Sequence, residues 1–231
     1  MAKDPSQPPP PSQVRSRPTI VTVHSGSDRW AAAVRHLRRV DHRLRALIER
    51  IGPCLLEPSE GRFGMLVSSI VAQQISARAA TAINARLHAL SGQPHQPERL
   101  LELGEDALRG VGLSAKKASY VLNLAEAVAS GRVPLTAFDE TWDDSAIIAS
   151  LTSIKGIGVW TAEMFLIFSL NRPDVLPVHD LGIRTALRDF HALAELPKPG
   201  DCHGLARSWK PFRTIACWYI WRNLDTKFVK S

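Results

Sequence analysis

Two glycines separated by one residue interrupt an otherwise helical stretch, Leu151-Thr-Ser-Ile-Lys-Gly-Ile-Gly-Val-Trp-Thr-Ala-Glu163. Apolar residues at helical spacing precede them, and an almost uncharged run, 159–170, follows. The pattern predicts two helices joined by a tight turn, because glycine allows a positive φ and a close approach of another backbone. The amides that begin the second helix then lie uncovered at the positive end of its dipole, where a phosphate group binds well. A glycine-broken helical hairpin inside a core gives the same pattern, so this motif alone is weak evidence.

A second motif follows twenty positions after Trp160, at Asp180, within Pro173-Asp-Val-Leu-Pro-Val-His-Asp-Leu-Gly-Ile-Arg184. The hairpin, the Gly/Pro-rich loop and the single aspartate resemble, in order and spacing, the helix-hairpin-helix, Gly/Pro-Asp superfamily of DNA base-excision glycosylases. The resemblance covers about 63–223, which is most of the chain outside the N-terminal region.

Hydrophobic periodicity predicts helices and no other confident element. We therefore expect an all-α fold of two helical lobes with a DNA-facing cleft between them. Residues 27–62 and 174–231 would form the first lobe, and residues 63–173 the second, which carries the hairpin 151–163. The expected helices are 28–51, 63–74, 76–90, 98–103, 104–109, 115–129, 144–153, 159–170, 181–190 and 214–223.

Smaller signals complete this outline. Ser76 and Ser114 are expected to cap helices, and Pro211 suits a first helical position. Lys116 and Lys117 are expected to be solvated, as are the arginines of the first helix. Residues 1–26, which are rich in Pro, Ser and Gln, are expected to be a disordered tail, apart from a stretch of strand character at 19–23.

The composition is compatible with a nucleic-acid partner. The chain has 231 residues, a net charge of +7 and a sequence pI of about 9.7. Such a charge favours binding to nucleic acid, although a solvated basic surface explains it equally well. With no signal peptide and no stretch long enough to span a membrane, we expect a cytoplasmic, nucleoid-associated protein, acting as a monomer.

The cysteines predict no metal centre. Cys54, Cys202 and Cys217 lie far apart without metal-ligand spacing, and their odd number argues against a disulfide framework. Several members of the superfamily hold an iron–sulfur cluster with four cysteines, which this chain lacks. We expect buried, inert thiols and no required cofactor.

Asp180 alone is most simply a helix N-cap. The resemblance makes it the catalytic residue. A carboxylate beside the sugar C1′ stabilises the oxocarbenium-like transition state of glycosidic cleavage, and it can also orient or deprotonate the attacking water. The sequence leaves these two roles open.

Trp160 indicates the subclass. In family members that also cut the DNA strand, a lysine at this position attacks C1′ and forms a Schiff base. Lys155 lies elsewhere in the turn, so a monofunctional glycosylase without a lyase step is expected. Alkylated purines such as 3-methyladenine and 7-methylguanine are cationic, and aromatic faces attract cations. The expected substrate pocket therefore contains Trp160, Met164, Trp218 and Trp221, of which Trp221 matches the pocket tryptophan of the 3-methyladenine DNA glycosylase II family, whereas Met164 replaces a tyrosine.

The resemblance also implies positions for DNA contacts. The amides of Gly156, Gly158 and Thr161 would face a phosphate, and Gln74, with Ile75 beside it, would be the wedge that fills the place of the flipped base. An apolar wedge is more usual, and Gln74 could equally be a polar helix-end residue. Backbone carbonyls would hold a structural Na+ or K+ ion at the hairpin, from Thr152, Ile154 and Gly156.

These signals favour an enzyme that flips out and hydrolytically releases alkylated purines from double-stranded DNA, leaving an abasic site. Two alternatives stay open. One is a non-catalytic helix-hairpin-helix DNA-binding module in which Asp180 is only a cap. The other is a uracil or mismatch glycosylase of the same fold.

Overall fold

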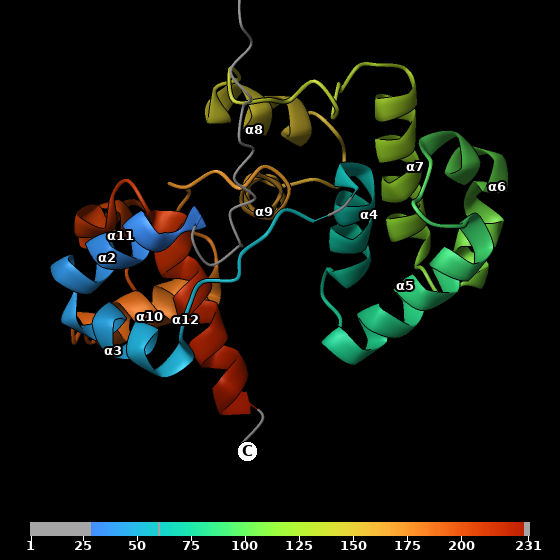
Figure 1. The fold of residues 1–231 in the computed structure, drawn as a ribbon. Coiled ribbons are helices and arrows are strands. Elements are labelled where there is room, and N and C mark those ends of the chain that lie inside the picture. Colours follow the sequence, from blue (N-terminus) through green and yellow to red (C-terminus); the bar gives the residue numbers. More distant parts are fainter. Residues whose placement is uncertain (1–28, 60, 229–231) are drawn as a thin grey trace, which may run out of the picture.

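The computed structural model describes residues 29–59 and 61–228, and every regular element within these ranges is helical (Figure 1). The predicted all-α architecture is therefore confirmed, whereas the expected tail and the strand-like stretch 19–23 lie outside the described residues. The elements are α2 (Ala31–Val40), α3 (His42–Ile51), α4 (Arg62–Ala72), α5 (Ala77–Ser91), α6 (Pro97–Gly110), α7 (Ala115–Ala129), α8 (Asp144–Thr152), α9 (Val159–Phe168), α10 (Leu181–Phe190), α11 (Pro199–Leu205), the 3-10 helix η1 (Arg207–Trp209) and α12 (Arg213–Phe228).

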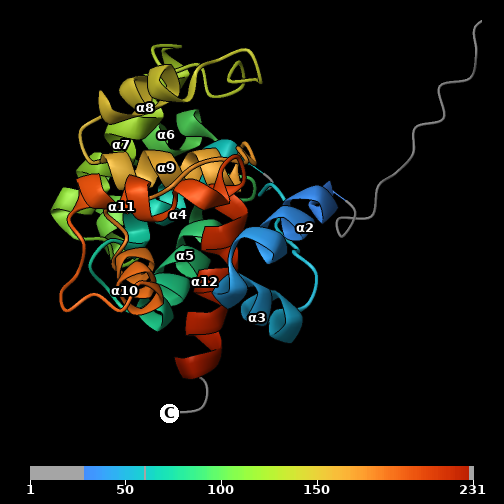
Figure 2. The same ribbon diagram turned by 90° about the vertical axis from the view of Figure 1, so that its left-hand side faces the viewer.

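The helices gather in two bodies. In one, α12 packs against α2, α3 and α10, and α11 and η1 join them. In the other, α4 packs against α5, α7 and α9, and α6 lies along α7. Figure 2, turned by 90°, shows α10 and α12 side by side with α3 beside them. This grouping resembles the two expected lobes, whose exact residue bounds stay a prediction.

Helix α9 lies between the two bodies and is seen nearly end-on in Figure 1. Its residues 161–167 are all buried, which explains why the sequence of this helix is apolar on every side. The segment that links α3 to α4 also reaches it, because the Ser59 amide donates to the Phe168 carbonyl at 2.7 Å. The C-terminal end of α9 is thereby tied to the segment between α3 and α4.

The long helix expected over 28–51 is wrong. Asp41 has an extended backbone (φ −143°, ψ 114°) and splits the segment into α2 and α3. Its carboxylate accepts hydrogen bonds from the amides of Arg43 and Leu44, so it caps α3, and the Trp209 indole donates to it from η1. A side chain that competes in this way for backbone amides ends one helix and starts the next.

Three other local expectations also differ from the structure. The two short pieces expected over 98–109 form one helix, α6, with a kink at Gly104 (φ 72°). Helix α12 begins at Arg213, so Pro211 precedes it instead of occupying its first position. Lys117 is half-buried and donates to the Val71 carbonyl at 2.7 Å, so it is not simply solvated. The expected caps Ser76 and Ser114 are confirmed, since each accepts an amide of its helix.

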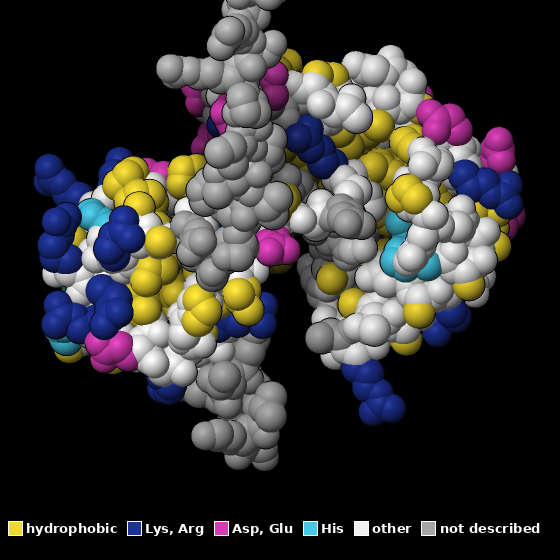
Figure 3. Space-filling model, viewed as in Figure 1, with side chains coloured by type: hydrophobic (Ala, Val, Ile, Leu, Met, Phe, Trp, Pro, Cys, Tyr) yellow, Lys and Arg dark blue, Asp and Glu magenta, His cyan; other side chains and the backbone are white. Residues whose placement is uncertain are grey.

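The remaining surface and core features are ordinary. The cysteines are free and buried, as expected. Arginines gather over α2 and α3, on the left-hand body in Figure 3, and the exposed ones are Arg35, Arg38, Arg39, Arg45 and Arg50. Within 29–59 and 61–228, no helix is both long and apolar enough to cross a lipid bilayer.

Candidate functional site

The predicted hairpin is present, and one of its glycines is sterically required. Helix α8 ends at Thr152 and α9 begins at Val159. Gly156 has a φ of 109°, and a Cβ there would lie 2.3 Å from the Tyr120 ring, so no larger residue fits. Gly158 differs from the expectation because its φ is −95°. Nothing lies within 4 Å of where its Cβ would be, and no side chain caps α9. The first amides of α9 therefore begin the helix without a side chain over them.

Two further loops meet the hairpin turn. The Gln73 side-chain amide donates to the Gly156 carbonyl at 3.0 Å and ties the α4–α5 loop to the turn. Gln74 follows at the loop tip, exposed and with a φ of 56°, and Ile75 is 37% exposed. Gln74 and Gly156 line a small hollow of about 340 Å³, and Ser114 and Lys116 from the start of α7 line it too. The predicted wedge residue Gln74 thus lies beside the predicted phosphate site.

The predicted cation site has competing hydrogen bonds. Of its three carbonyl oxygens, the oxygen of Gly156 accepts from Gln73, and that of Ile154 accepts from the Ile157 amide at 3.0 Å. Each carbonyl keeps a second lone pair, so an ion could still share these oxygens. The cation at Thr152, Ile154 and Gly156 stays a prediction.

Asp180 caps α10, and three N–H groups hold its carboxylate. Oδ1 accepts from the Ile183 amide at 2.9 Å and from the Trp221 indole at 3.2 Å. Oδ2 accepts from the Trp160 indole at 3.1 Å. Because a carboxylate offers about four acceptor positions, one position remains on Oδ2. Asp180 as a whole is half-buried, so it is not sealed inside the core.

The loop that precedes Asp180 is fastened to the start of α12. The Arg213 guanidinium makes two hydrogen bonds to the Asp174 carboxylate, at 2.6 and 2.9 Å. The Thr214 hydroxyl donates to the Arg172 carbonyl at 2.6 Å and accepts from the Val175 amide at 3.0 Å. These bonds fix the loop and α12 together, which brings Trp221 of α12 to Asp180.

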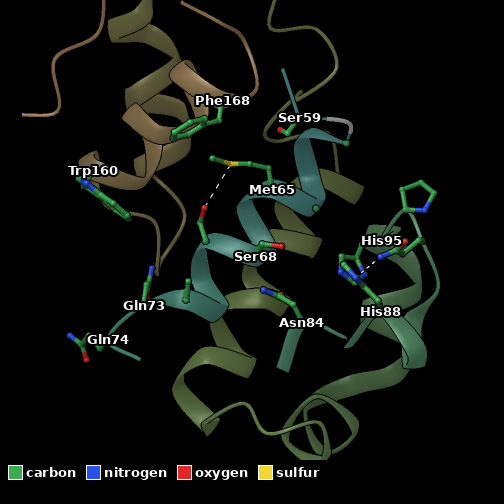
Figure 4. Close-up of a pocket in the computed structure, with 16 residues that line it drawn as sticks. Ser59, Met65, Ser68, Gln73, Gln74, Asn84, His88, His95, Trp160 and Phe168 are labelled. Carbon is green, nitrogen blue, oxygen red and sulfur yellow. Dashed lines mark hydrogen bonds between the residues drawn. The ribbon is translucent and has the colours of Figure 1, made fainter. Parts of the chain in front are cut away.

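Aromatic side chains connect Asp180 to a large cavity. The cavity has a volume of about 1270 Å³ and is lined along α4 by Met65 and Ser68, with Trp160 and Phe168 opposite (Figure 4). Trp160 is 39% exposed, and the Phe168 ring packs against Trp221 at 5.8 Å between centroids. Asp180 does not itself line the cavity, but the Trp160 indole that borders it donates to the Asp180 carboxylate.

The far end of this cavity is polar, which the sequence analysis did not anticipate. His95 is buried, and its Nδ1 lies 2.7 Å from the Ser91 hydroxyl, which already donates to the Leu87 carbonyl. Nδ1 is therefore the donor and Nε2 the acceptor. Burial lowers the pKa of His95 to about 4, aided by the neighbouring His88, so the ring is neutral at pH 7.

The structure adds a carboxyl group that the sequence analysis missed. Glu163 is only 8% exposed, and its buried Oε2 has no hydrogen-bond partner within 29–59 and 61–228. Burial, followed by the nearby charge of Asp180, raises the pKa of Glu163 to about 7. A lone carboxyl group in an apolar helix is the sequence signal that could have drawn attention to it, because Glu is rarely buried without a partner.

Two predicted pocket residues are not brought to Asp180 by any hydrogen bond or ring contact among the described residues. Trp218 is buried, and its ring meets that of Tyr219 at 5.0 Å and lies below the Arg222 guanidinium. Met164 is 6% exposed within α9. Their place in a substrate pocket stays a prediction.

Comparison with known proteins identifies the class of protein. Residues 67–211 match the family model described as HhH-GPD superfamily base excision DNA repair protein. Because this match covers more than half of the chain, the protein belongs to this superfamily, and the predicted resemblance is confirmed.

Individual relatives are 3-methyladenine glycosylases. Over 193 residues the chain is 36% identical to DNA-3-methyladenine glycosylase 1 of Schizosaccharomyces pombe, covering 81% of this chain and 85% of the relative. The solved structure of the S. pombe 3-methyladenine DNA glycosylase in complex with abasic DNA superposes with a TM-score of 0.73 at 34% identity, covering 83% of this chain and 95% of the other. DNA-3-methyladenine glycosidase from Bacillus halodurans gives a TM-score of 0.72 at 38% identity and covers 82% and 88%.

Proposed function

We propose that this base-excision repair protein is a monofunctional DNA glycosylase that releases alkylated purines, such as 3-methyladenine and 7-methylguanine, from double-stranded DNA. The names of its relatives support this activity, since DNA-3-methyladenine glycosylase 1 of S. pombe and the B. halodurans enzyme are 36% and 38% identical to it over the aligned residues. The observation that carries the proposal is the Asp180 carboxylate, oriented by three N–H donors at the start of a helix with one acceptor position open.

The chemistry follows from this arrangement. A fixed carboxylate stabilises positive charge that develops at C1′ as the glycosidic bond breaks, and its open oxygen can accept a proton from water. A cationic alkylated base leaves without further help because the departing electron pair neutralises it. The indole faces of Trp160 and Trp221, which both donate to Asp180, are suited to attract such a cationic base.

Trp160 supports the absence of a lyase step. An indole N–H cannot attack C1′ as an amine does, and here it is engaged with the Asp180 carboxylate. Borohydride should therefore trap no covalent complex between this protein and damaged DNA. A trapped complex would contradict the monofunctional mechanism.

The DNA contacts belong to the same proposal. The hairpin turn and the uncapped start of α9 would bind a backbone phosphate through the amides of Gly156, Gly158 and Thr161, and Gln74 would occupy the gap left by the flipped nucleotide. A phosphate contact at the hairpin fixes the duplex without reading its sequence. We expect a monomer to suffice, since these groups all come from one chain.

Side-by-side assays of base release from three duplexes test the proposal. Duplexes containing 7-methylguanine, 3-methyladenine or uracil are incubated with the protein, and free bases are measured by chromatography. We expect release from the two alkylated duplexes. Release of uracil alone would favour a uracil glycosylase, and binding without release of any base would favour a non-catalytic DNA-binding module.

A further inference from the structure

Glu163 lies on the face of α9 that is turned to the reactive carboxylate. It follows Trp160 by three positions, so the two side chains lie on the same side of the helix. The Trp160 indole donates to Asp180 at 3.1 Å, which shows that this side of α9 meets the start of α10. Glu163 is more than nine-tenths buried there, with Oε2 unpaired.

Three helices converge at this point, and few charges face the Glu163 carboxyl. Asp180 at the start of α10 raises the pKa of Glu163, after the larger effect of burial. On α12, burial and then Asp180 raise the pKa of the Cys217 thiol well above its usual range, with smaller effects from Arg213 and Glu163. Cys217 is therefore neutral at physiological pH, and Asp180 is the charge beside Glu163.

Two carboxyl groups with different surroundings divide acid and base roles. Asp180 accepts three N–H groups, whereas Oε2 of Glu163 has no donor among the described residues. The carboxyl group that lacks donors and is buried keeps its proton up to about pH 7, well above the usual range of a carboxyl group. Since Oε2 of Glu163 is buried and has no hydrogen-bond partner among the described residues, its proton is not committed to another group of the protein.

We propose that Glu163 is the general acid of the site, which protonates the departing base when that base is neutral, as hypoxanthine is. This inference rests on the glycosylase activity proposed above. With a neutral purine, the C1′–N9 bond breaks, its electron pair goes to the base, and the Glu163 proton passes to a ring nitrogen of that base. Water adds to C1′ and gives its proton to Asp180, and proton transfer from Asp180 back to Glu163 through solvent restores the site.

The proposal separates two classes of substrate. A cationic base such as 7-methylguanine becomes neutral when it takes the electron pair, so it needs no proton from Glu163. A neutral base would leave as an anion without one. General acid catalysis contributes about 10²–10⁴-fold to a reaction rate, so the two classes should differ strongly in their dependence on Glu163.

The test compares E163Q with the wild-type protein on duplexes containing hypoxanthine or 7-methylguanine, under single-turnover conditions between pH 6 and 9. At pH 6, E163Q should lose about 100-fold or more on hypoxanthine and less than about threefold on 7-methylguanine. Wild-type hypoxanthine release should fall relative to 7-methylguanine release as the pH rises through about 7, the pKa of Glu163, because the acid form is lost. In E163Q, the ratio of hypoxanthine release to 7-methylguanine release should not change with pH. E195Q, at an exposed position, is the matched control.

A folding measurement accompanies the kinetics. The pKa of Glu163 is higher in the folded protein than its ordinary value of 4.5, so the folded state binds more protons between about pH 4.5 and 7 and loses stability as the pH rises through this range. E163Q lacks this loss and should melt at or above the wild-type temperature at pH 8.

Three outcomes would overturn the inference. These are equal loss on both substrates, unchanged hypoxanthine release in E163Q, and a wild-type protein that releases 7-methylguanine but no hypoxanthine. In each case the proposed glycosylase activity still stands. A wild-type protein that releases neither base would contradict that activity as well.

Discussion

Two aspartates in this protein hold nearly the same set of hydrogen bonds in very different surroundings. Asp41 caps α3 through Oδ1 and accepts the Trp209 indole on Oδ2 at 3.0 Å. Asp180 caps α10 through Oδ1 and accepts the Trp160 indole on Oδ2 at 3.1 Å. Asp41 is 9% exposed inside the first body, whereas Asp180 is half-buried and linked through Trp160 to the cavity.

The difference shows what makes a cap available for chemistry. The donors at Asp41 come from α3 and η1, which pack within one body, so its carboxylate joins elements permanently. The donors at Asp180 come from its own helix α10 and from α9 and α12, and α9 lies between the bodies. Helix capping explains both side chains equally well, and only the position of Asp180 allows it to meet a substrate.

The largest effect is expected from D180N. Asparagine still caps α10 through its side-chain oxygen, but it carries no charge. Removal of one preorganised electrostatic group typically costs about 10²–10³-fold in rate, so 7-methylguanine release should fall by that factor. Single-turnover release measures the loss, and circular dichroism should show a fold that is retained. Release within threefold of the wild type would mean that Asp180 is a cap like Asp41.

D41A should have the reverse effect. It removes the cap of α3 and leaves the Trp209 indole, which is fully buried, without an acceptor. The two losses together lower the free energy of unfolding by about 2–4 kcal/mol, which corresponds to roughly 5–15 °C in melting temperature. The rate per folded molecule should stay within about twofold. A large loss of rate without a loss of stability would contradict the structural role of Asp41.

The indole donors provide a matched pair of smaller changes. W209F removes the indole N–H that donates to Asp41, and W221F removes the indole N–H that donates to Asp180. Both variants keep an aromatic ring. A hydrogen bond to a charged group contributes about 1.5–3 kcal/mol, so W209F should lower the melting temperature and W221F should slow base release by about tenfold. In thermal melts and release assays on both variants, W209F should change mainly the melting temperature and W221F mainly the rate of base release. If both variants only melt earlier, the two aspartates are equivalent.

G182A is expected to have the smallest effect. A Cβ at this position would lie 2.8 Å from the Leu224 Cδ1 and 3.2 Å from the Asp180 Oδ1. The end of the leucine side chain can move, and alanine is the better helix former by about 0.5–1 kcal/mol. We therefore expect a rate within about threefold of the wild type and an unchanged or higher melting temperature. A rate loss beyond tenfold would show that the position of Asp180 tolerates almost no displacement.

Local sequence motifs predicted the hairpin and the aspartate at the start of α10 because both depend on residues close together in the chain. A turn with a positive φ needs glycine at 156, and an aspartate before an apolar-periodic segment starts a helix. The bounds of α7 and α10 were also predicted to the residue, for the same reason.

Features that depend on contacts between distant segments were not predictable. Asp41 fits the polar side of one long amphipathic helix as well as it fits a break, and the indole that helps to hold its capping carboxylate lies 168 positions later. Glu163 stands out in an apolar helix, but α9 is buried all round and has no periodicity to show which side faces Asp180. The cavity likewise joins α5 and the loop that follows it with α4 and with Trp160 and Phe168 of α9.

The most direct test is the affinity for a duplex whose damaged nucleotide is replaced by a cationic pyrrolidine analogue of the sugar, compared with a neutral abasic analogue. The pyrrolidine carries positive charge where the oxocarbenium would form, so an anionic Asp180 should favour it. We predict that the wild type and D41N bind the cationic duplex at least tenfold more tightly than the neutral one, and that D180N loses this preference. An undiminished preference in D180N would contradict the proposal that the Asp180 carboxylate faces the anomeric carbon.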